Sequence, residues 1–77
     1  MAVNILLFGQ LTDITGKSKL LMEDVADTNS LVTAMNSMYP ALNNTKYIVA
    51  VDKQVISENS KLDNNSTVAF LPAFSGG

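Results

Sequence analysis

Two strongly apolar segments near the ends of the chain constrain its fold more than any other feature. Val3–Phe8 and Thr67–Leu71 have the length and the residue types of β-strands. In the first segment Asn4 shares one face with Leu6 and Phe8, so the other, uniformly apolar face should point into the core. A first and a last strand of this kind often pair at the centre of a sheet. We therefore expect the two ends of the chain to lie side by side.

A single helical segment is predicted between these strands. Its apolar residues recur at the spacing of one helix face, namely Leu31, Ala34, Met35 and Met38. Ser30 is the expected N-cap, and Pro40 disfavours helical geometry at the residue before it. The helix should therefore run from roughly residue 30 to residue 39. In the last strand, Val68 and Phe70 are the bulkier pair and should meet this apolar face of the helix.

The remaining segments define the fold class. Lys19–Met22 and Tyr47–Val51 are predicted strands, and Asp52-Lys53 followed by Gln54–Ile56 predicts a tight hairpin. Gln10–Thr15 is expected to form a wide connection or a helical turn. The order of two strands, a helix and three strands favours an α+β domain of the β-grasp type. We expect a mixed sheet of four to five strands with one main helix packed on one face.

The composition excludes most kinds of autonomous chemistry. The 77 residues include no Cys and no His, which removes thiol nucleophiles, imidazole bases, disulfides and Cys/His metal sites. Five scattered lysines are outnumbered by seven acidic residues, for a net charge of −2, so the sequence has no basic stripe for nucleic acid. We expect no bound cofactor, no metal ion and no nucleic-acid partner.

The apolar runs also bear on where the protein acts. They are strand-sized, as in Ile5–Phe8, and far below the ~20 residues that a membrane-spanning helix needs. The first residues lack the basic stretch and the cleavage pattern of a signal peptide. We expect a cytoplasmic protein with no membrane partner.

Two glycines end the chain, and the short segment Pro72–Ser75 leads to them. Because glycine has no Cβ, Gly76 and Gly77 can enter a narrow active site and present the terminal carboxylate there. With Cys and His absent, this carboxylate is the reactive group that the sequence offers. We place the folded domain at residues 1–71 and a flexible diglycine tail at residues 72–77.

An apolar surface is predicted beside this tail. If Val68 and Phe70 face the helix, Leu71 must lie on the opposite face of the sheet together with Leu6 or Phe8. In a two-layer domain those side chains would be exposed, as at a docking surface. The candidate partner-binding residues are Phe8, Val55, Leu71 and Phe74. Scattered surface apolar residues, which are normal on any protein, remain the alternative.

Several stretches of the sequence match the pattern of a known family. They are Leu7–Leu11 running to Thr15-Gly16, Met38–Pro40, Val49–Val51, and Leu62-Asp63 leading into Val68–Gly77. Over essentially its whole length the chain resembles the small, sulfur-carrying subunits of molybdopterin synthase, which are ubiquitin-like β-grasp proteins. Thiamine-pathway sulfur carriers are similar in fold and also end in Gly-Gly, but they tend to lack the segment from Phe8 to Gly16. Phe74 is bulkier than the residue usual there, so the partner's pocket should have room for an aromatic ring.

The resemblance implies a chemistry for the terminus. A ubiquitin-activating-type adenylyltransferase would use ATP to adenylate Gly77, and sulfur from a sulfur donor enzyme would then displace AMP to leave a thiocarboxylate. The tail, kept slim by Gly76, would enter the large subunit of molybdopterin synthase. There the sulfur would pass to cyclic pyranopterin monophosphate during molybdenum cofactor biosynthesis. On this interpretation the chain donates sulfur but is not catalytic alone.

Three alternatives stay open. The first is a sulfur carrier of the thiazole/thiamine pathway or of another thio-cofactor. The second is a ubiquitin-like modifier whose Gly77 is conjugated to lysines of other proteins. The third is a plain β-grasp interaction module.

Overall fold

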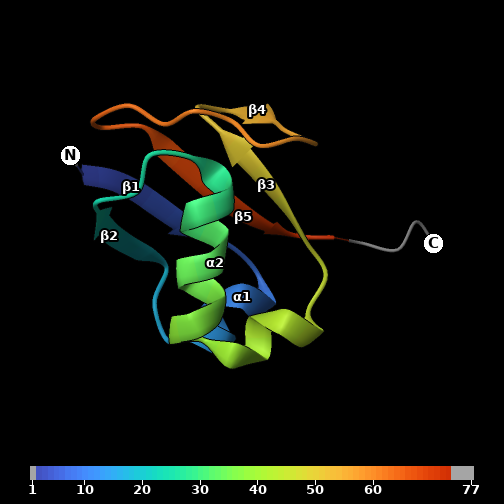
Figure 1. Cartoon of the computed structure of the whole chain (residues 1–77). Coiled ribbons are helices and arrows are strands. Elements are labelled where there is room, and N and C mark those ends of the chain that lie inside the picture. The colour runs from blue at the N-terminus through green and yellow to red at the C-terminus, as the bar shows by residue number, and fades with distance from the viewer. Residues whose placement is uncertain (1, 74–77) are drawn as a thin grey trace.

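The computed structural model describes residues 2–73 of the chain (Figure 1). Its elements are β1 (Ala2–Leu7), α1 (Gln10–Thr15), β2 (Lys19–Glu23), α2 (Thr28–Met38), the 3₁₀-helix η1 (Pro40–Asn44), β3 (Tyr47–Val51), β4 (Gln54–Val55) and β5 (Thr67–Pro72). All the predicted strands are present. The segment from residue 10 to residue 15, predicted as a wide connection or a helical turn, forms the short helix α1. The predictions for Phe74, Gly76 and Gly77 concern residues outside the described range.

The five strands form one mixed sheet in the order β2-β1-β5-β3-β4. The central strands β1 and β5 are parallel, with Ile5 opposite Val68 and Leu7 opposite Phe70. The other neighbours in the sheet are antiparallel. The prediction that the first and last strands pair at the centre is therefore confirmed. With α2 packed across one face (Figure 1), the arrangement is the ubiquitin-like β-grasp fold that the sequence predicts.

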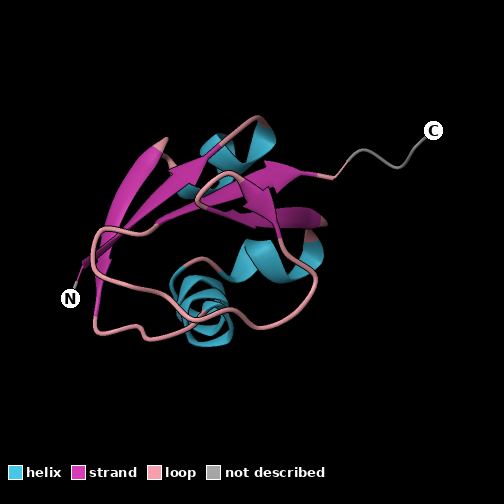
Figure 2. Cartoon of the chain, turned by 90° about the horizontal axis from the view of Figure 1, so that it is seen from above, coloured by secondary structure: helices cyan, strands magenta, loops and turns pink. Residues whose placement is uncertain are grey.

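The core lies between the sheet and α2. Figure 2 shows α2 and η1 together on one side of the strands. The side chains that meet there are almost completely buried and include Val3, Ile5, Leu7, Leu31, Met35, Leu42, Val68 and Phe70. Strand alternation thus placed the core faces of β1 and β5 correctly, because a buried face must take every second residue of a strand.

The start of α2 differs from the prediction. Asp27, and not Ser30, is the N-cap: its backbone is extended, and its carboxylate accepts a hydrogen bond from the Ser30 N–H at 2.9 Å. The helix therefore begins at Thr28, two residues earlier than expected. Both residue types can cap a helix, and the choice falls on Asp27, which itself forms a β-bridge with Lys61. That long-range contact is not visible in the local sequence.

The apolar stripe of α2 is also shorter than predicted. Leu31 and Met35 are fully buried, but Met38 is 54% exposed, so its assignment to the core face is wrong. The chain turns away after Tyr39 into η1, as Pro40 predicts, and η1 contributes Leu42 to the core.

The predicted tight hairpin joins β3 and β4. Asp52 and Lys53 have φ values of 48° and 73°, and a two-residue turn of the type that suits the twist of antiparallel strands requires positive φ at both positions. β4 then pairs with β3 through Val55 opposite Ala50 and Gln54 opposite Val51. The hairpin therefore forms although neither turn residue is glycine.

The segment after β4 crosses back to the start of α2. The Thr28 N–H donates to the carbonyl of Ser60, and the Ser60 N–H donates to Thr28 Oγ1 at 2.8 Å. Asn59 Oδ1 accepts the Asn29 N–H at 2.8 Å. These bonds satisfy donors at the helix start that have no partner within the helix. No helix between residues 2 and 73 is long and apolar enough to cross a membrane.

Candidate functional site

The face of the sheet opposite α2 carries a row of small and apolar side chains. Leu6 of β1 lies opposite Ala69 of β5, Ala69 lies opposite Ala50 of β3, and Ala50 lies opposite Val55 of β4. Because residues in register share a face of the sheet, the row crosses four strands. Two alanines form its low middle, and the larger Leu6 and Val55 stand at either side. The face is hollow along this line.

That hollow is a groove with a volume of about 510 Å³. It is lined by Leu6, Phe8, Ala50, Asp52, Lys53, Val55, Thr67, Ala69 and Leu71. Three of the four predicted partner-binding residues, Phe8, Val55 and Leu71, therefore lie around one groove. Phe8 is 44% exposed and Val55 is 68% exposed, so large apolar side chains meet solvent here. The fourth, Phe74, lies outside the described residues.

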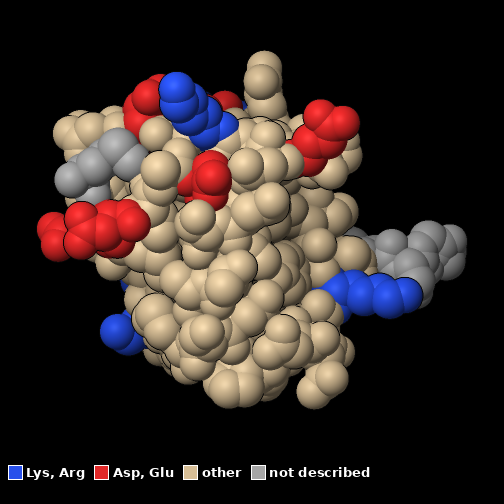
Figure 3. Space-filling model, in the orientation of Figure 1, with Lys and Arg blue, Asp and Glu red and all other residues tan. Residues whose placement is uncertain are grey.

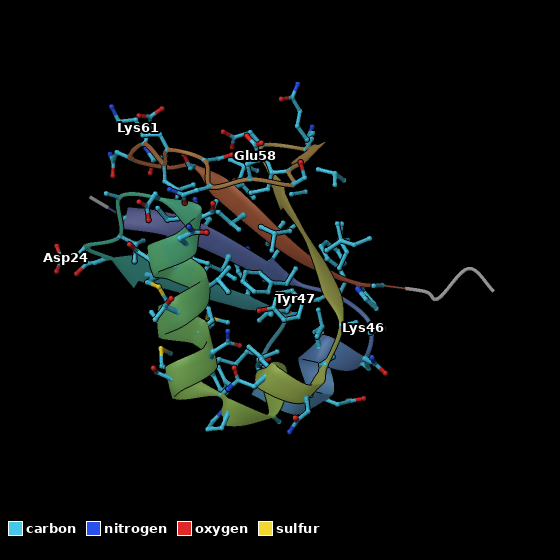
Figure 4. The ribbon with its side chains drawn as sticks, turned by 45° about the vertical axis from the view of Figure 1, so that its right-hand side comes forward. Asp24, Lys46, Tyr47, Glu58 and Lys61 are labelled. Carbon is cyan, nitrogen blue, oxygen red and sulfur yellow. The ribbon has the colours of Figure 1, made fainter. Side chains whose placement is uncertain are left out.

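One end of the groove lies beside the point where the chain leaves the sheet. The Phe8 N–H donates to the carbonyl of Phe70 at 3.2 Å, which brings Phe8 to the end of β5. Beyond Leu71, Pro72 is in register with Tyr47, and the Ala73 N–H donates to the carbonyl of Lys46 at 3.3 Å. Figure 4 shows Lys46 and Tyr47 next to this exit. The apolar groove and the base of the tail are thus neighbours.

A second groove, of about 400 Å³, lies between α2 and the β3–β4 edge. Its lining includes Thr28, Asn29, Tyr47, Val55 and Asn59. The Thr28 hydroxyl donates to Asn59 Oδ1 at 3.1 Å, and the same oxygen accepts the Asn29 N–H. These polar groups are already used to hold the helix start, so we assign them to folding.

Charged side chains are unevenly spread on the face that α2 covers. Figure 3 shows acidic side chains gathered over the upper part of this face, while the lysines stand apart from one another. Below the acidic side chains this view shows lysines only at the left and right edges, and the central lower surface consists of uncharged residues. The part of this face that the structure describes has no continuous positive surface. In residues 2–73 no three carboxylates cluster closely enough to hold a metal ion.

Sequence comparison places the chain among known proteins. The profile of the ThiS family matches residues 5–77. The chain belongs to the ThiS family. The match includes the second half of β1, all of β5 and the residues beyond Ala73, so it spans both the groove and the tail.

One curated relative and two solved structures extend the comparison. The chain is 28% identical over 80 residues to a molybdopterin synthase sulfur carrier subunit from Dictyostelium discoideum, covering 95% of this chain and 93% of the relative. Small archaeal modifier protein 1 from Methanosarcina acetivorans superposes with a TM-score of 0.83 at 18% identity, covering 99% and 96% of the two chains. A complex of subunits 1 and 2 of molybdopterin-converting factor from Helicobacter pylori gives a TM-score of 0.73 at 21% identity, with full coverage of both chains.

Two features of the site were missed from the sequence. Ala50 forms part of the groove; strand alternation within Tyr47–Val51 separates it from Val49 and Val51, but only the register of β3 with β5 places it opposite Ala69. The second is a close contact between Gly9 and Pro72, where a Cβ on Gly9 would lie 2.6 Å from Pro72 Cγ. Gly9 reads as an ordinary turn glycine, and only the parallel pairing of β1 with β5 brings it to Pro72.

Proposed function

We propose that this chain is the sulfur carrier subunit of a molybdopterin synthase, with its C-terminal Gly77 as the carrier group. The observation that carries the proposal is its likeness to the Dictyostelium sulfur carrier subunit over 95% of its length. Membership of the ThiS family supports it. The absence of Cys from the sequence also supports it, because a protein that carries transferable sulfur without a thiol must use another group.

The proposed chemistry begins with activation of a poor electrophile. An oxygen of the Gly77 carboxylate attacks the α-phosphate of ATP, pyrophosphate leaves, and an acyl adenylate forms on an adenylyltransferase of the ubiquitin-activating type. The terminal sulfur of a donor enzyme's persulfide then attacks the acyl carbon, and AMP leaves. A second thiol reduces the resulting acyl disulfide and releases the thiocarboxylate. Sulfur in this form is far more nucleophilic than the original carboxylate oxygen.

Sulfur delivery follows in a partner. In our proposal the tail enters the large subunit, the thiocarboxylate sulfur is transferred to cyclic pyranopterin monophosphate, and hydrolysis restores the carboxylate. The acids and bases of this step belong to the large subunit. Gly76 and Gly77 keep the tail narrow, since neither has a Cβ.

The groove is the proposed docking surface for the large subunit. Phe8, Val55 and Leu71 line it, and it opens beside the exit of the tail. An apolar hollow with polar residues at its edge has the make-up of the centre and rim of a protein interface. Phe74 is proposed to add an aromatic contact next to it. The Helicobacter complex of subunits 1 and 2, one chain of which shares this fold, supports a two-subunit assembly.

Intact-protein mass spectrometry tests the carrier function. The chain is incubated with ATP, the activating enzyme and a sulfur source, and we expect one terminal oxygen to be replaced by sulfur. The thiocarboxylated chain is then mixed with the large subunit and cyclic pyranopterin monophosphate, and its terminus should return to a carboxylate as product forms. A thiocarboxylated chain that donates its sulfur only in the reaction of a thiazole synthase would instead favour the thiamine pathway. No oxygen-to-sulfur exchange at all would overturn the proposal.

Two tail variants localise the chemistry. Gly77→Ala and Gly76→Ala should abolish sulfur transfer. In each variant the added methyl group would obstruct entry of the tail into the narrow active site of the large subunit and restrict the backbone of the tail. Their thermal unfolding should match that of the unchanged protein, since both positions follow the last strand, β5, in the sequence. Normal thiocarboxylation and product formation by Gly77→Ala would contradict this role of the tail.

A protein modifier is the second candidate. The likeness in fold to small archaeal modifier protein 1 favours it, at a TM-score of 0.83. A modifier would be found joined through Gly77 to lysines of other proteins after incubation with ATP and a cell extract. Tryptic fragments in which a lysine of another protein carries residues 62–77, the stretch that follows the last lysine of this chain, would favour this function over sulfur transfer if no pterin product forms.

A further inference from the structure

We propose that Gly9 and Pro72 are positioning residues for sulfur delivery, because their contact sets the direction in which the chain leaves β5 towards Gly77. This inference rests on the proposed function. It adds a specific role for two residues that the docking surface and the tail chemistry do not include.

The contact depends on glycine at position 9. Gly9 has φ 57° and ψ −136°, a backbone conformation that residues other than glycine rarely adopt. A Cβ added there would lie 2.6 Å from Cγ, 3.6 Å from Cδ and 3.7 Å from Cβ of Pro72. Real Cβ atoms do not approach another carbon as closely as the first distance. The proline ring therefore occupies the space that a side chain on residue 9 would take.

Pro72 is held on its other side by β3. It is in register with Tyr47, and the next residue, Ala73, donates its N–H to the carbonyl of Lys46 at 3.3 Å. Proline has no N–H and a fixed φ, and it is tolerated where a strand needs no further ladder bond. Along β5 the backbone hydrogen-bonding groups point alternately to β1, as at Phe70, and to β3, as at Ala73. The backbone nitrogen of residue 72 therefore faces β1, which has already ended at Leu7. Residues 72 and 73 are thus held between β3 and the turn at Gly9.

The short span to the terminus makes this direction matter. Residues 74 to 77 can reach at most roughly 13 Å beyond Ala73. At full reach, a change of about 20° in the exit direction would move Gly77 by roughly 4.5 Å, and four residues leave little length to compensate. A misplacement of about 1 Å between reacting groups can already cost about a hundredfold in rate. The exit direction set at Pro72 is therefore a factor in delivery.

Four variants separate positioning from stability. Pro72→Ala removes the ring, Gly9→Ala forces the ring to move, and the double variant removes the clash that Gly9→Ala creates. Gly16→Ala is the control, because Gly16 also has positive φ, at 72°, but an added Cβ would meet no atom within 4 Å. The measurements are the single-turnover rate of sulfur transfer at saturating large subunit, the dissociation constant of the complex, and the residual dipolar coupling of the Ala73 amide.

The expected result is a loss of rate without a loss of docking. Pro72→Ala and Gly9→Ala should each slow transfer by about tenfold or more, while the dissociation constant changes by less than about twofold. The double variant should be no slower than the worse single variant, since both act through one contact. Gly16→Ala should transfer within about twofold of the unchanged protein. The Ala73 coupling should change in Pro72→Ala and not in Gly16→Ala.

The proposal is overturned if Pro72→Ala is folded and transfers sulfur at the normal rate, or if the effects of the two single variants multiply. It is also overturned if the dissociation constant rises in proportion to the lost rate, because the contact would then serve docking. If Gly9→Ala does not fold, Pro72→Ala decides the matter alone. If the unchanged chain forms no thiocarboxylate, the proposed function fails, and an unchanged Ala73 coupling in Pro72→Ala would separately overturn the positioning role.

Discussion

Asp52 and Thr67 exchange two hydrogen bonds across neighbouring strands: the Asp52 N–H donates to the carbonyl of Thr67 at 2.8 Å, and the Thr67 N–H donates to the Asp52 carboxylate at 2.9 Å. The first residue of the β3–β4 turn is thereby tied to the start of the central strand β5. Lys53 and Val55, which follow it, line the groove next to this tie. The turn thus positions one wall of the proposed docking surface.

Replacing Asp52 should weaken this tie. Asp52→Ala removes the acceptor and places alanine at a φ of 48°, so we expect the free energy of unfolding to fall by about 1 to 2 kcal/mol in urea titrations. Asp52→Asn keeps an oxygen acceptor and a residue that tolerates left-handed backbone, and should lose less. Equal losses for the two variants would show that the side-chain acceptor is unimportant.

Asp27 should contribute a pH-dependent part of the stability. Hydrogen bonding by the Ser30 side chain, by the Ser30 N–H and by Asn59 lowers the pKa of Asp27 below its ordinary value of 3.8. A lowered folded pKa means that the ionised group stabilises the fold above about pH 4, and that this contribution is lost as the pH falls through the folded pKa. Asp27→Asn should therefore unfold more easily at neutral pH and lose less stability as the pH falls below about 4. Parallel pH profiles for the two proteins would contradict this.

Phe70 is expected to be the most sensitive core position. It is fully buried, and its ring centroid lies 5.0 Å from that of Tyr47. Phe70→Ala should cost about 3 to 5 kcal/mol, which is much of the stability of a small domain. Phe70→Leu leaves a smaller cavity and should remain folded with a lower melting temperature. Circular dichroism during heating measures both.

Two methionines on α2 should behave differently. Met35 is fully buried, whereas Met38 is 54% exposed. Met35→Ala should lower the free energy of unfolding by about 2 to 5 kcal/mol, and Met38→Ala by no more than about 0.5 kcal/mol. The pair shares residue type, helix and substitution, so the difference reports burial alone. Similar losses would mean that Met38 packs against the core in solution.

The docking groove can be tested by placing an aspartate at either of two groove positions, with a third aspartate outside the groove as the control. Val55→Asp places a charge in the groove at a side chain that is 68% exposed, so it should weaken binding to the large subunit by about tenfold or more and leave the fold intact. Leu21→Asp is the control, because Leu21 is 64% exposed and pairs with Asn4 on the same face, but does not line the groove. Leu71→Asp should act as Val55→Asp does. Calorimetric titration with the large subunit measures all three, and unchanged binding by Val55→Asp would count against the groove.

Much of the architecture follows from local patterns. Alternation within Val3–Phe8 and Thr67–Leu71 identified the core faces of both central strands, because each face repeats every second residue. The same alternation predicted Leu71 and Leu6 or Phe8 on the outer face, and Val55 joins them at the groove through its register with Ala50. Asp27 was misjudged in favour of Ser30, since the cap depends on a bridge to a distant segment.

By itself the sequence determined the succession of strands and helix along the chain, the single main helix, the buried faces of the central strands and the absence of thiol and imidazole groups. These are properties of composition and of short-range periodicity. Only the tertiary structure decided the alanine floor of the groove, the tie between Asp52 and Thr67, and the contact of Gly9 with Pro72. Each of these depends on the register between strands that are far apart in the chain, and register is set by how the whole core packs.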